Sequence, residues 1–285
     1  MKVILSRKGC DSDFGGMPGI IMPDDRIVYI PIPGDDFETI AYHEVNAGNG
    51  LGNLCDVISQ VSAHMKMYGK KLEINPETKC HLDPDLDAGM YPRKSGWRGC
   101  FGQADAAQTV LKKAGVAEGD LFLFFGWFNR TCYKDGRLKF CKGQGIHMIF
   151  GWLQIEKAIY THEMPVPDWL EYHPHAIQRR LDRPSNCIYT GKERLSWNPA
   201  IRGYGVFPRA GDALVLTKKG YSRSRWELPA SLKGIPITYH KDTSWKEDYF
   251  QSACRGQEFV FEEHKAVEKW ARGLIESAYC EVRHG

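Results

Sequence analysis

The chain has 285 residues, of which 42% are hydrophobic and 26% charged, values typical of a folded protein with a substantial core. The net charge of +3 is too small to indicate nucleic-acid binding, so only local clusters can do so. No apolar run approaches the ~20 residues of a membrane-spanning helix, and Ser6-Arg7-Lys8 interrupts the N-terminal apolar residues too early for a signal peptide. Nine scattered cysteines without a C-x-x-C pair indicate reduced thiols. We therefore expect a cytoplasmic protein.

The N-terminal part begins with a predicted strand, residues 2–5, and a polar loop from Ser6 to Gly16. Asp11 lies in this loop among cations and glycines. Carboxylates at the end of a strand often project into a cleft, and glycines let backbone N–H groups approach an anion. A charged surface turn is the alternative interpretation. Residues 28–33 predict an edge strand, because prolines cannot donate to a ladder.

Apolar residues at helical spacing predict an amphipathic helix over 51–68. A second polar cluster follows at 80–86, where His81, Asp83 and Asp85 surround a proline. The segment down to Gly102 interleaves cations with aromatic rings: Tyr91, Arg93, Lys94, Trp97, Arg98 and Phe101. Such interleaving suits a phosphate backbone with stacked bases, although an exposed loop explains it too. A helix over 103–114 is predicted to end at Gly115.

Two apolar, aromatic-rich runs, 119–128 and 146–155, dominate the middle of the chain. Turn formers between Asn129 and Gly136 separate them, which predicts two strands of an antiparallel sheet. The continuous apolarity of the first run indicates burial on both faces. Each run contains a Gly-Trp pair, where a backbone or a flat ligand can approach closely; kinks in a barrel are the alternative.

The C-terminal third adds further candidates. His162, His173 and His175 suggest a metal site, but no carboxylate or cysteine cluster completes it, so we expect structural histidines and no metal. Residues 214–217 predict a strand. The following run, 221–226, pairs hydroxyls with guanidinium groups, as a phosphate clamp requires, unless it is a solvated basic turn. A helix over 264–278 should pack Val267, Trp270, Leu274 and Ile275 on the sheet.

Several of these motifs together resemble the third class of nucleotide modification associated domains, found in phages and bacteria. The similarity spans most of the chain, and Cys10 occupies a position where an aromatic residue is expected. The motifs that carry the resemblance are Ile4-Leu5-Ser6-Arg7-Lys8-Gly9 with Asp11, His81-Leu82-Asp83-Pro84-Asp85-Leu86, Phe150-Gly151-Trp152-Leu153-Gln154, Gly220-Tyr221-Ser222-Arg223-Ser224 and Gly256-Gln257-Glu258-Phe259. The family is associated with systems that write, read or attack modified DNA bases.

The resemblance implies a fold and a function. The strand pattern around the Gly-Trp pairs is similar to PUA and EVE barrels, so we expect an α+β fold whose curved, central antiparallel sheet is surrounded by helices. One domain, 1–285, is expected, with a possible subdivision into 1–118 and 119–285. A similar protein is an anti-phage DNA glycosylase that removes glucosylated hydroxymethylcytosine. The implied activity is thus base flipping in phage DNA and hydrolysis of the N-glycosidic bond, without a cofactor.

The same resemblance suggests roles for individual residues. Asp11 is the first candidate for the carboxylate that stabilises positive charge on the sugar and orients water. Asp85 and Asp83 are reserve candidates, and His81 is expected to polarise the leaving base or a sugar hydroxyl. The expected base pocket consists of Trp152, Gln154, Phe101 and Trp127. The expected DNA contacts are Arg7, Lys8, Arg93, Lys94, Arg98, Ser222, Arg223, Ser224 and Arg225. Lys8 is also a candidate Schiff-base nucleophile if its pKa is lowered.

Two other functions are compatible with the same residues. An enzyme that builds base modifications needs a donor pocket, and the sequence contains neither a phosphate loop nor a nicotinamide fingerprint. A reader of modified bases without catalytic activity is the other alternative, against which the polar clusters at Asp11 and Asp85 argue only mildly.

Overall fold

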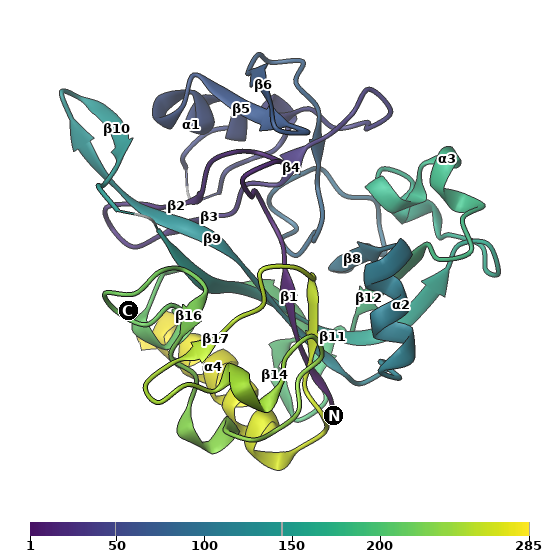
Figure 1. Ribbon diagram of the computed structural model, residues 1–285. Coiled ribbons are helices and arrows are strands. Elements are labelled where there is room, and N and C mark those ends of the chain that lie inside the picture. Colours follow the sequence, from purple (N-terminus) through teal and green to yellow (C-terminus); the bar gives the residue numbers. More distant parts are fainter. Residues whose placement is uncertain (49, 144, 285) are drawn as a thin grey trace.

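A curled mixed sheet forms the centre of the molecule (Figure 1). The computed structural model describes residues 1–48, 50–143 and 145–284. The main path of the sheet runs in the order β18-β1-β9-β11-β12-β8. These strands are β1 (Val3–Arg7), β8 (Cys100–Gln103), β9 (Leu121–Lys134), β11 (Ile146–Tyr160), β12 (Cys187–Gly191) and β18 (Glu258–Val260). The predicted α+β class with a central curved sheet is confirmed.

The two central apolar runs pair as antiparallel strands, as predicted. Phe128 of β9 lies opposite Ile146 of β11, and the register shifts between Ile149 and Gly151. The predicted turn over 129–136 is wrong in its extent. The strand β9 continues to Lys134 and pairs with β10 (Arg137–Phe140) across a tight turn at Asp135 and Gly136, both with positive φ. Asp-Gly with positive φ suits a two-residue hairpin.

The sheet is not wholly antiparallel, because β1 runs parallel to β9, from Val3 opposite Leu121 to Arg7 opposite Phe125. On its other side β1 pairs antiparallel with β18. The strand β2 (Gly19–Ile21) is also parallel to β9 and pairs with β3 (Ile27–Val28). Residues 121–126 are all buried, which confirms the expected burial on both faces of this run.

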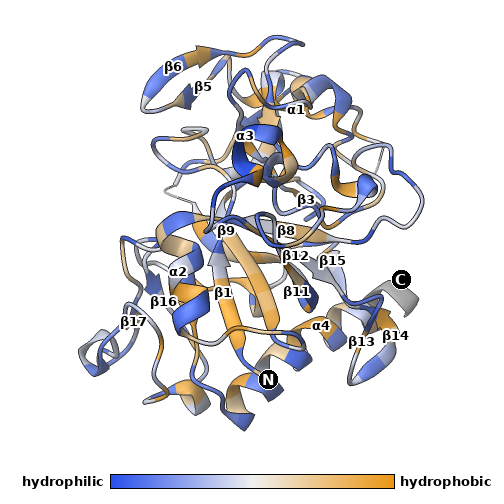
Figure 2. Cartoon of the chain, turned by 90° about the vertical axis from the view of Figure 1, so that its right-hand side faces the viewer, coloured by the Kyte–Doolittle hydropathy of each residue, from blue (hydrophilic) through white to orange (hydrophobic). Residues whose placement is uncertain are grey.

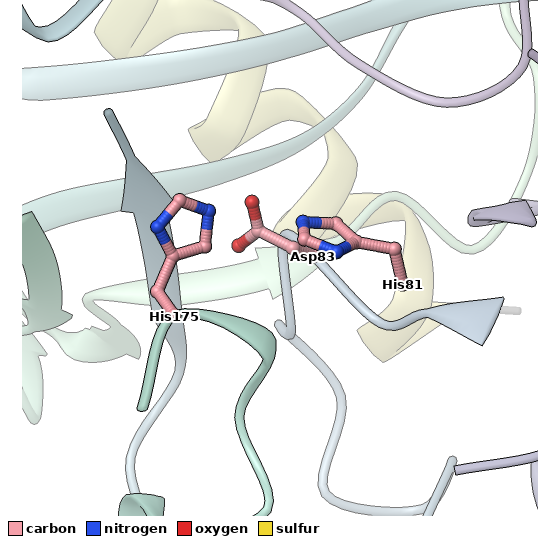
Figure 3. A group of neighbouring side chains, drawn as sticks. All are labelled: His81, Asp83 and His175. Atoms are coloured by element: carbon pink, nitrogen blue, oxygen red, sulfur yellow. The ribbon is translucent and has the colours of Figure 1, made fainter. Parts of the chain in front are cut away.

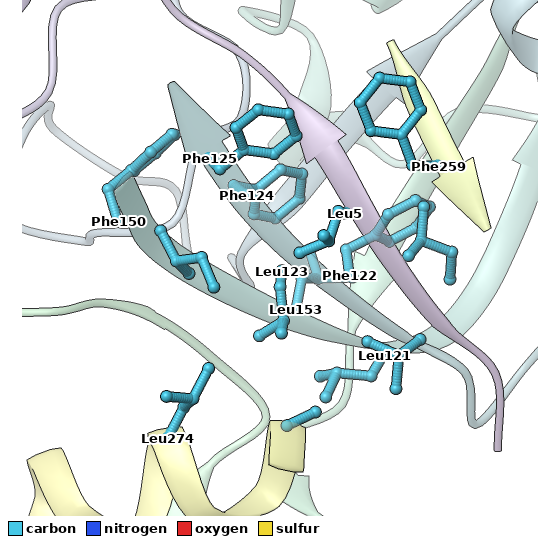
Figure 4. Close-up of a cluster of buried hydrophobic side chains, with 14 of the residues drawn as sticks. Leu5, Leu121, Phe122, Leu123, Phe124, Phe125, Phe150, Leu153, Phe259 and Leu274 are labelled. Atoms are coloured by element: carbon cyan, nitrogen blue, oxygen red, sulfur yellow. The ribbon is translucent and has the colours of Figure 1, made fainter. Parts of the chain in front are cut away.

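Two of the three hydrophobic clusters among the described residues are large. The larger contains β1, β9, β11 and the face of α4 (Lys265–His284) that carries Leu274 (Figure 4). Its aromatic rings pack edge to face, as Phe101 does on Phe122 at 5.0 Å between centroids. The smaller core gathers residues from the first 90 positions around α1 (Leu54–Val61), together with Leu138 of β10. Figure 2 shows hydrophobic residues along the strands beside β1 and on α1.

The remaining elements are short. They are β4 (Ile32–Pro33), β5 (His64–Met67), β6 (Lys70–Glu73), β7 (Cys80–His81), β13 (Arg194–Leu195), β14 (Asn198–Arg202), β15 (Tyr204–Val206), β16 (Arg225–Trp226), β17 (Phe250–Gln251), α2 (Asp105–Lys113) and α3 (Gln178–Leu181). The expected edge strand over 28–33 is two fragments, β3 and β4. The predicted strand 214–217 is also wrong. Residues 212–214 form a 3-10 turn, followed by single bridges at Val215 and Thr217.

The helix predictions are confirmed in place but not always in length. The first helix ends at Val61, and β5 and β6 form a hairpin where its C-terminal part was expected. Tyr68 and Gly69 have positive φ and form the turn, a feature that helical periodicity does not reveal. Gly115 has φ of 63° after α2, as expected of a helix stop. Among the described helices, none has the length and apolarity that crossing a bilayer requires.

Close backbone approach explains the glycines of the two Gly-Trp pairs. A Cβ at Gly126 would lie 2.5 Å from the carbonyl oxygen of Lys8. At Gly151 it would lie 2.8 Å from the carbonyl oxygen of Gly205 and 2.6 Å from Leu86 Cδ1. These glycines therefore admit neighbouring chain segments, and Gly126 lets the end of β1 lie directly on β9.

Gly126→Ala is expected to lower the free energy of unfolding by about 1–3 kcal/mol, because the Lys8 carbonyl has to move. Urea unfolding followed by circular dichroism measures this change. Gly273→Ala in α4 is the matched control, since a Cβ there has no atom within 4 Å. That variant should be neutral or slightly more stable, as alanine favours helix. Equal unfolding midpoints for Gly126→Ala and the parent chain would contradict the close approach.

Candidate functional site

A cavity of about 850 Å³ opens at the C-terminal end of β1, between segments from both cores. Its walls come from the loop after β1, from the ends of β7 and β8, from β9 and β11, and from two C-terminal loops. The charged and aromatic residues of the lining include Arg7, Lys8, Asp11, His81, Asp83, Trp127, His147, His175 and Arg223. The volume falls within the ~300–1,000 Å³ typical of small-molecule sites, so the cavity can hold a small molecule.

The loop after β1 holds Asp11 in one orientation. Its Oδ1 accepts the backbone N–H groups of Asp13 at 2.8 Å and Phe14 at 2.7 Å. The loop is fastened to β5, since Gly15 and Lys66 exchange two backbone hydrogen bonds. Asp11 Oδ2 receives no hydrogen bond from the described residues, and the side chain is exposed at the cavity. The β5–β6 hairpin, absent from the sequence prediction, therefore holds the loop that carries Asp11 in place.

One wall of the cavity is basic and aromatic. The guanidinium group of Arg223 lies 4.0 Å from the centroid of the Trp127 ring, a cation–π contact. Arg7 donates to the carbonyl oxygens of Ala253 and Cys254 at 2.7 and 3.0 Å. Burial lowers the pKa of both arginines and Asp11 partly offsets this, which leaves two cations beside a carboxylate. The guanidinium groups of this wall can bind an anion, and its indole ring can stack on a flat ring.

Lys8 lines the cavity and pairs with a buried carboxylate. Its Nζ lies 3.0 Å from Oε1 of Glu258, a fully buried carboxylate, and 4.5 Å from the centroid of Phe101. The same Glu258 oxygen accepts from Ser6 Oγ at 3.0 Å and Gln103 Nε2 at 2.6 Å. This pairing argues against Lys8 as a Schiff-base nucleophile, because moving the amine away from Glu258 would leave a buried carboxylate without its partner.

A second wall carries imidazoles and a carboxylate. His81, Asp83 and His175 each present one ligand atom, and these atoms lie within 4.8 Å of one another (Figure 3). Burial alone would raise the pKa of Asp83, but interactions with His173, His175 and His81 lower it to about 2. Burial lowers the pKa of His175 to about 3. At neutral pH the wall therefore combines a carboxylate with a neutral imidazole.

His147 and His175 line the cavity although neither was proposed for the site. Burial, with smaller effects of Arg7 and Arg223, lowers the pKa of His147 to about 3, and its Nδ1 lies 3.1 Å from Trp226 Nε1. The signal for His147 was an imidazole within an otherwise apolar strand. His175 was considered but set aside for lack of a carboxylate. That reason does not hold, because the fold brings Asp83 and His81 beside it.

Asp85 lies outside the cavity lining. Its carboxylate is fully buried, accepts from Arg93 at 2.6 Å and from the Tyr172 hydroxyl at 2.5 Å, and lies 3.3 Å from Trp97 Nε1. Burial raises the pKa of Asp85 despite Arg93. These partners make Asp85 and Arg93 a buried pair that holds the 85–97 loop. Nothing in this arrangement brings Asp85 to the anomeric carbon of a ligand in the cavity.

Other expected residues also lie elsewhere. Trp152 Nε1 donates to the Arg202 carbonyl, and the Gln154 amide is buried against Ser196 and Gly119. Phe101 is fully buried in the core. Three of the expected DNA contacts lie on the surface outside the lining, with partners of their own: Lys94 with Glu171, Arg98 with Glu156, and Arg225 over Tyr221 and Tyr249. Ser222 and Ser224 line the cavity with Arg223, as do Arg7 and Lys8.

Asp85→Asn should lower the free energy of unfolding by about 3–5 kcal/mol, because it leaves the buried Arg93 without its counter-charge. Thermal and urea unfolding measure the change. Asp36→Asn, at an exposed carboxylate, is the control and should stay within about 0.5 kcal/mol of the parent chain. Wild-type stability in Asp85→Asn would contradict a structural role for this carboxylate.

A DNA phosphate contact at Arg223 predicts that Arg223→Ala weakens DNA binding and lowers the slope of log K against log salt by about one unit, the value for one lost contact. Arg225→Ala is the matched control. Its guanidinium already lies over two tyrosine rings outside the cavity, so the slope should change less. Fluorescence anisotropy at several salt concentrations measures both slopes. An unchanged slope in Arg223→Ala would assign the 221–226 run to a solvated basic turn.

Comparison with known proteins gives one result that covers most of the chain. Residues 2–262 match the family model described as nucleotide modification associated domain 3. Among curated proteins and among solved structures, no significant similarity to this chain was found. The matched range includes β1, the Asp11 loop, the 80–86 motif and every cavity residue named above. The chain belongs to the nucleotide modification associated domain 3 family.

Proposed function

We propose that this protein is a DNA N-glycosylase that excises modified bases, such as glucosylated hydroxymethylcytosine, from phage DNA. The family description links the chain to modified nucleotides. The observation that carries the finer proposal is that one cavity holds the Asp11 carboxylate together with the Arg223–Trp127 pair. A cavity of this size admits a flipped nucleotide, and the enlarged base of a hypermodified nucleotide makes use of its volume.

The cationic wall suits the phosphate groups that flank a flipped nucleotide. Arg7 and Arg223 present guanidinium groups, which bind phosphate oxygens in a fixed geometry. Trp127 offers a ring on which a base can stack, and stacking of this kind contributes about 1–3 kcal/mol per base. Together these contacts offset the few kcal/mol that unpairing and unstacking cost.

Asp11 is then the residue proposed to act on the sugar. Cleavage of the N-glycosidic bond develops positive charge at the anomeric carbon, which a nearby carboxylate stabilises. Water adds to that carbon as the base departs with the bonding electron pair, and the carboxylate takes the proton of the water. The two backbone N–H groups that donate to Oδ1 hold the carboxyl group in one rotamer. The conformation of the loop therefore sets the direction in which Oδ2 points.

Asp11→Asn should lower the rate of base release by about 10²–10⁴ while folding and DNA affinity are retained, because it removes the charge and the basicity but keeps the size. Incubation with phage DNA that carries modified bases, followed by an abasic-site assay, measures the rate. Asp13→Asn is the matched control, since this carboxyl group lines the same cavity in the same loop.

Two outcomes would contradict the proposal. Binding of modified DNA by the wild-type chain without abasic sites would indicate a reader of modified bases. Full base release by both Asp11→Asn and Asp13→Asn would exclude the carboxylates of this loop, and a parallel assay of Asp83→Asn would then test the second wall of the cavity.

A further inference from the structure

We propose that His81, Asp83 and His175 bind a divalent first-row transition-metal ion on the wall of the cavity. The three side chains come from two segments about 90 positions apart, β7 with the residues after it and the turn before α3. Two imidazoles and one carboxylate form the ligand set of open mononuclear sites, in which water or a substrate oxygen completes the coordination. Figure 3 shows both rings turned toward the Asp83 carboxylate.

The hydrogen bonds of the His81 and His175 rings engage Nδ1 of each ring and leave Nε2 available to bind a metal ion. Nδ1 of His81 lies 2.9 Å from Glu38 Oε1, and the same oxygen accepts from Arg180 at 2.9 Å. A carboxylate can only accept, so Nδ1 of His81 carries the hydrogen and Nε2 keeps its lone pair. Metal-binding histidines are commonly oriented in this way by a carboxylate on the second nitrogen.

His175 has the same arrangement with an amide. Its Nδ1 lies 2.6 Å from Asn186 Oδ1. The Asn186 Nδ2 group donates to the His175 carbonyl at 2.7 Å and to Thr161 Oγ1 at 2.9 Å, which determines that the amide oxygen faces the ring. The His175 Nδ1 therefore donates, and Nε2 is the acceptor. Both rings thus present Nε2 as the free ligand atom.

The carboxylate is oriented as well. Asp83 Oδ1 accepts the Gly102 N–H at 2.8 Å and lies 3.3 Å from Nε2 of His173. His173 Nδ1 accepts from the His175 backbone N–H, so the hydrogen of this ring is on Nε2, which makes no hydrogen bond to the described residues. Asp83 Oδ2 receives no hydrogen bond from the described residues, which leaves it for an ion.

The geometry allows one ion to reach all three groups. Metal–nitrogen distances of about 2.1 Å allow two ligand atoms to be at most about 4.2 Å apart. The ligand atoms lie within 4.8 Å of one another, and small side-chain rotations shorten these separations to about 4.2 Å. The open positions of the ion would face the cavity. If the proposed function holds, a phosphate or hydroxyl oxygen of the nucleotide is a suitable further ligand, but metal binding itself does not depend on that function.

Cobalt(II) is the probe, because its visible absorption reports nitrogen ligation and coordination number. The chain, freed of metal with a chelator, is titrated with Co²⁺ by absorption spectroscopy and calorimetry. One ion per chain is expected, with ligand-field bands absent from the free ion and a rise in Tm on metal addition. His81→Gln should lose the bands and the Tm shift. Glu38→Ala should weaken binding by about 10–100-fold, as expected when the partner of a ligand is removed.

His64→Gln is the matched control, since this imidazole is exposed on β5 away from the cavity, and it should bind Co²⁺ as the parent chain does. His81 is partly exposed, so the variant is expected to fold, which circular dichroism without metal checks. Absence of binding by the wild-type chain, or equal binding by His81→Gln, would overturn the proposal. Because these readouts need no DNA, they separate the metal site from the proposed base release.

Discussion

A buried carboxylate, Glu258, connects the strands beneath the cavity. It is fully buried on β18, and its Oε1 receives Ser6 of β1, Gln103 of β8 and the ammonium group of Lys8. An unpaired charge at this depth would cost several kcal/mol, so the network constrains β1 and β8 to meet at one point. The Asp11 loop starts from β1 and the Asp83–Gly102 contact from β8, which makes the position of both cavity walls depend on this pairing.

The same constraint separates residues that look alike in sequence. Lys8 and Arg7 are adjacent cations, yet Lys8 is directed at Glu258 while Arg7 lies in the basic wall beside Asp11 and Arg223. Asp83 and Asp85 are two positions apart, and they also differ. Asp83 faces the histidines of the cavity, whereas Asp85 is enclosed by Arg93, Trp97 and Tyr172. Side-chain alternation along extended backbone accounts for the first difference, because Arg7 and Lys8 are adjacent. It does not account for the second, since positions two apart share a face; there the contacts with other segments decide, and Asp85 is bridged to Cys100 of β8.

The cavity therefore has two chemically distinct walls. The basic and aromatic wall, with Arg223 on Trp127, suits a nucleotide with its phosphates. The wall of His81, Asp83 and His175 offers lone pairs and one negative charge, which suit a cation or the proton-transfer steps of catalysis. Membership of the nucleotide modification associated domain 3 family links the chain to modified nucleotides.

The sequence by itself determined the class of the fold, the central strand pair and the two polar motifs. Apolar periodicity and turn residues are local signals, so β9, β11, α2 and α4 were predictable, and the Asp11 loop and the His81–Asp83 motif already stood out as polar clusters.

The joint position of these two motifs at one cavity depends on contacts between residues far apart in the chain. The parallel pairing of β1 with β9 and the meeting of Asp83 with His175 are contacts of this kind. Sequence patterns give residue types and spacing, but only the tertiary structure decided that His175 has a carboxylate beside it and that Asp85, Trp152 and Gln154 face other partners. The physical reason is that burial and hydrogen-bond satisfaction are settled between segments rather than within them.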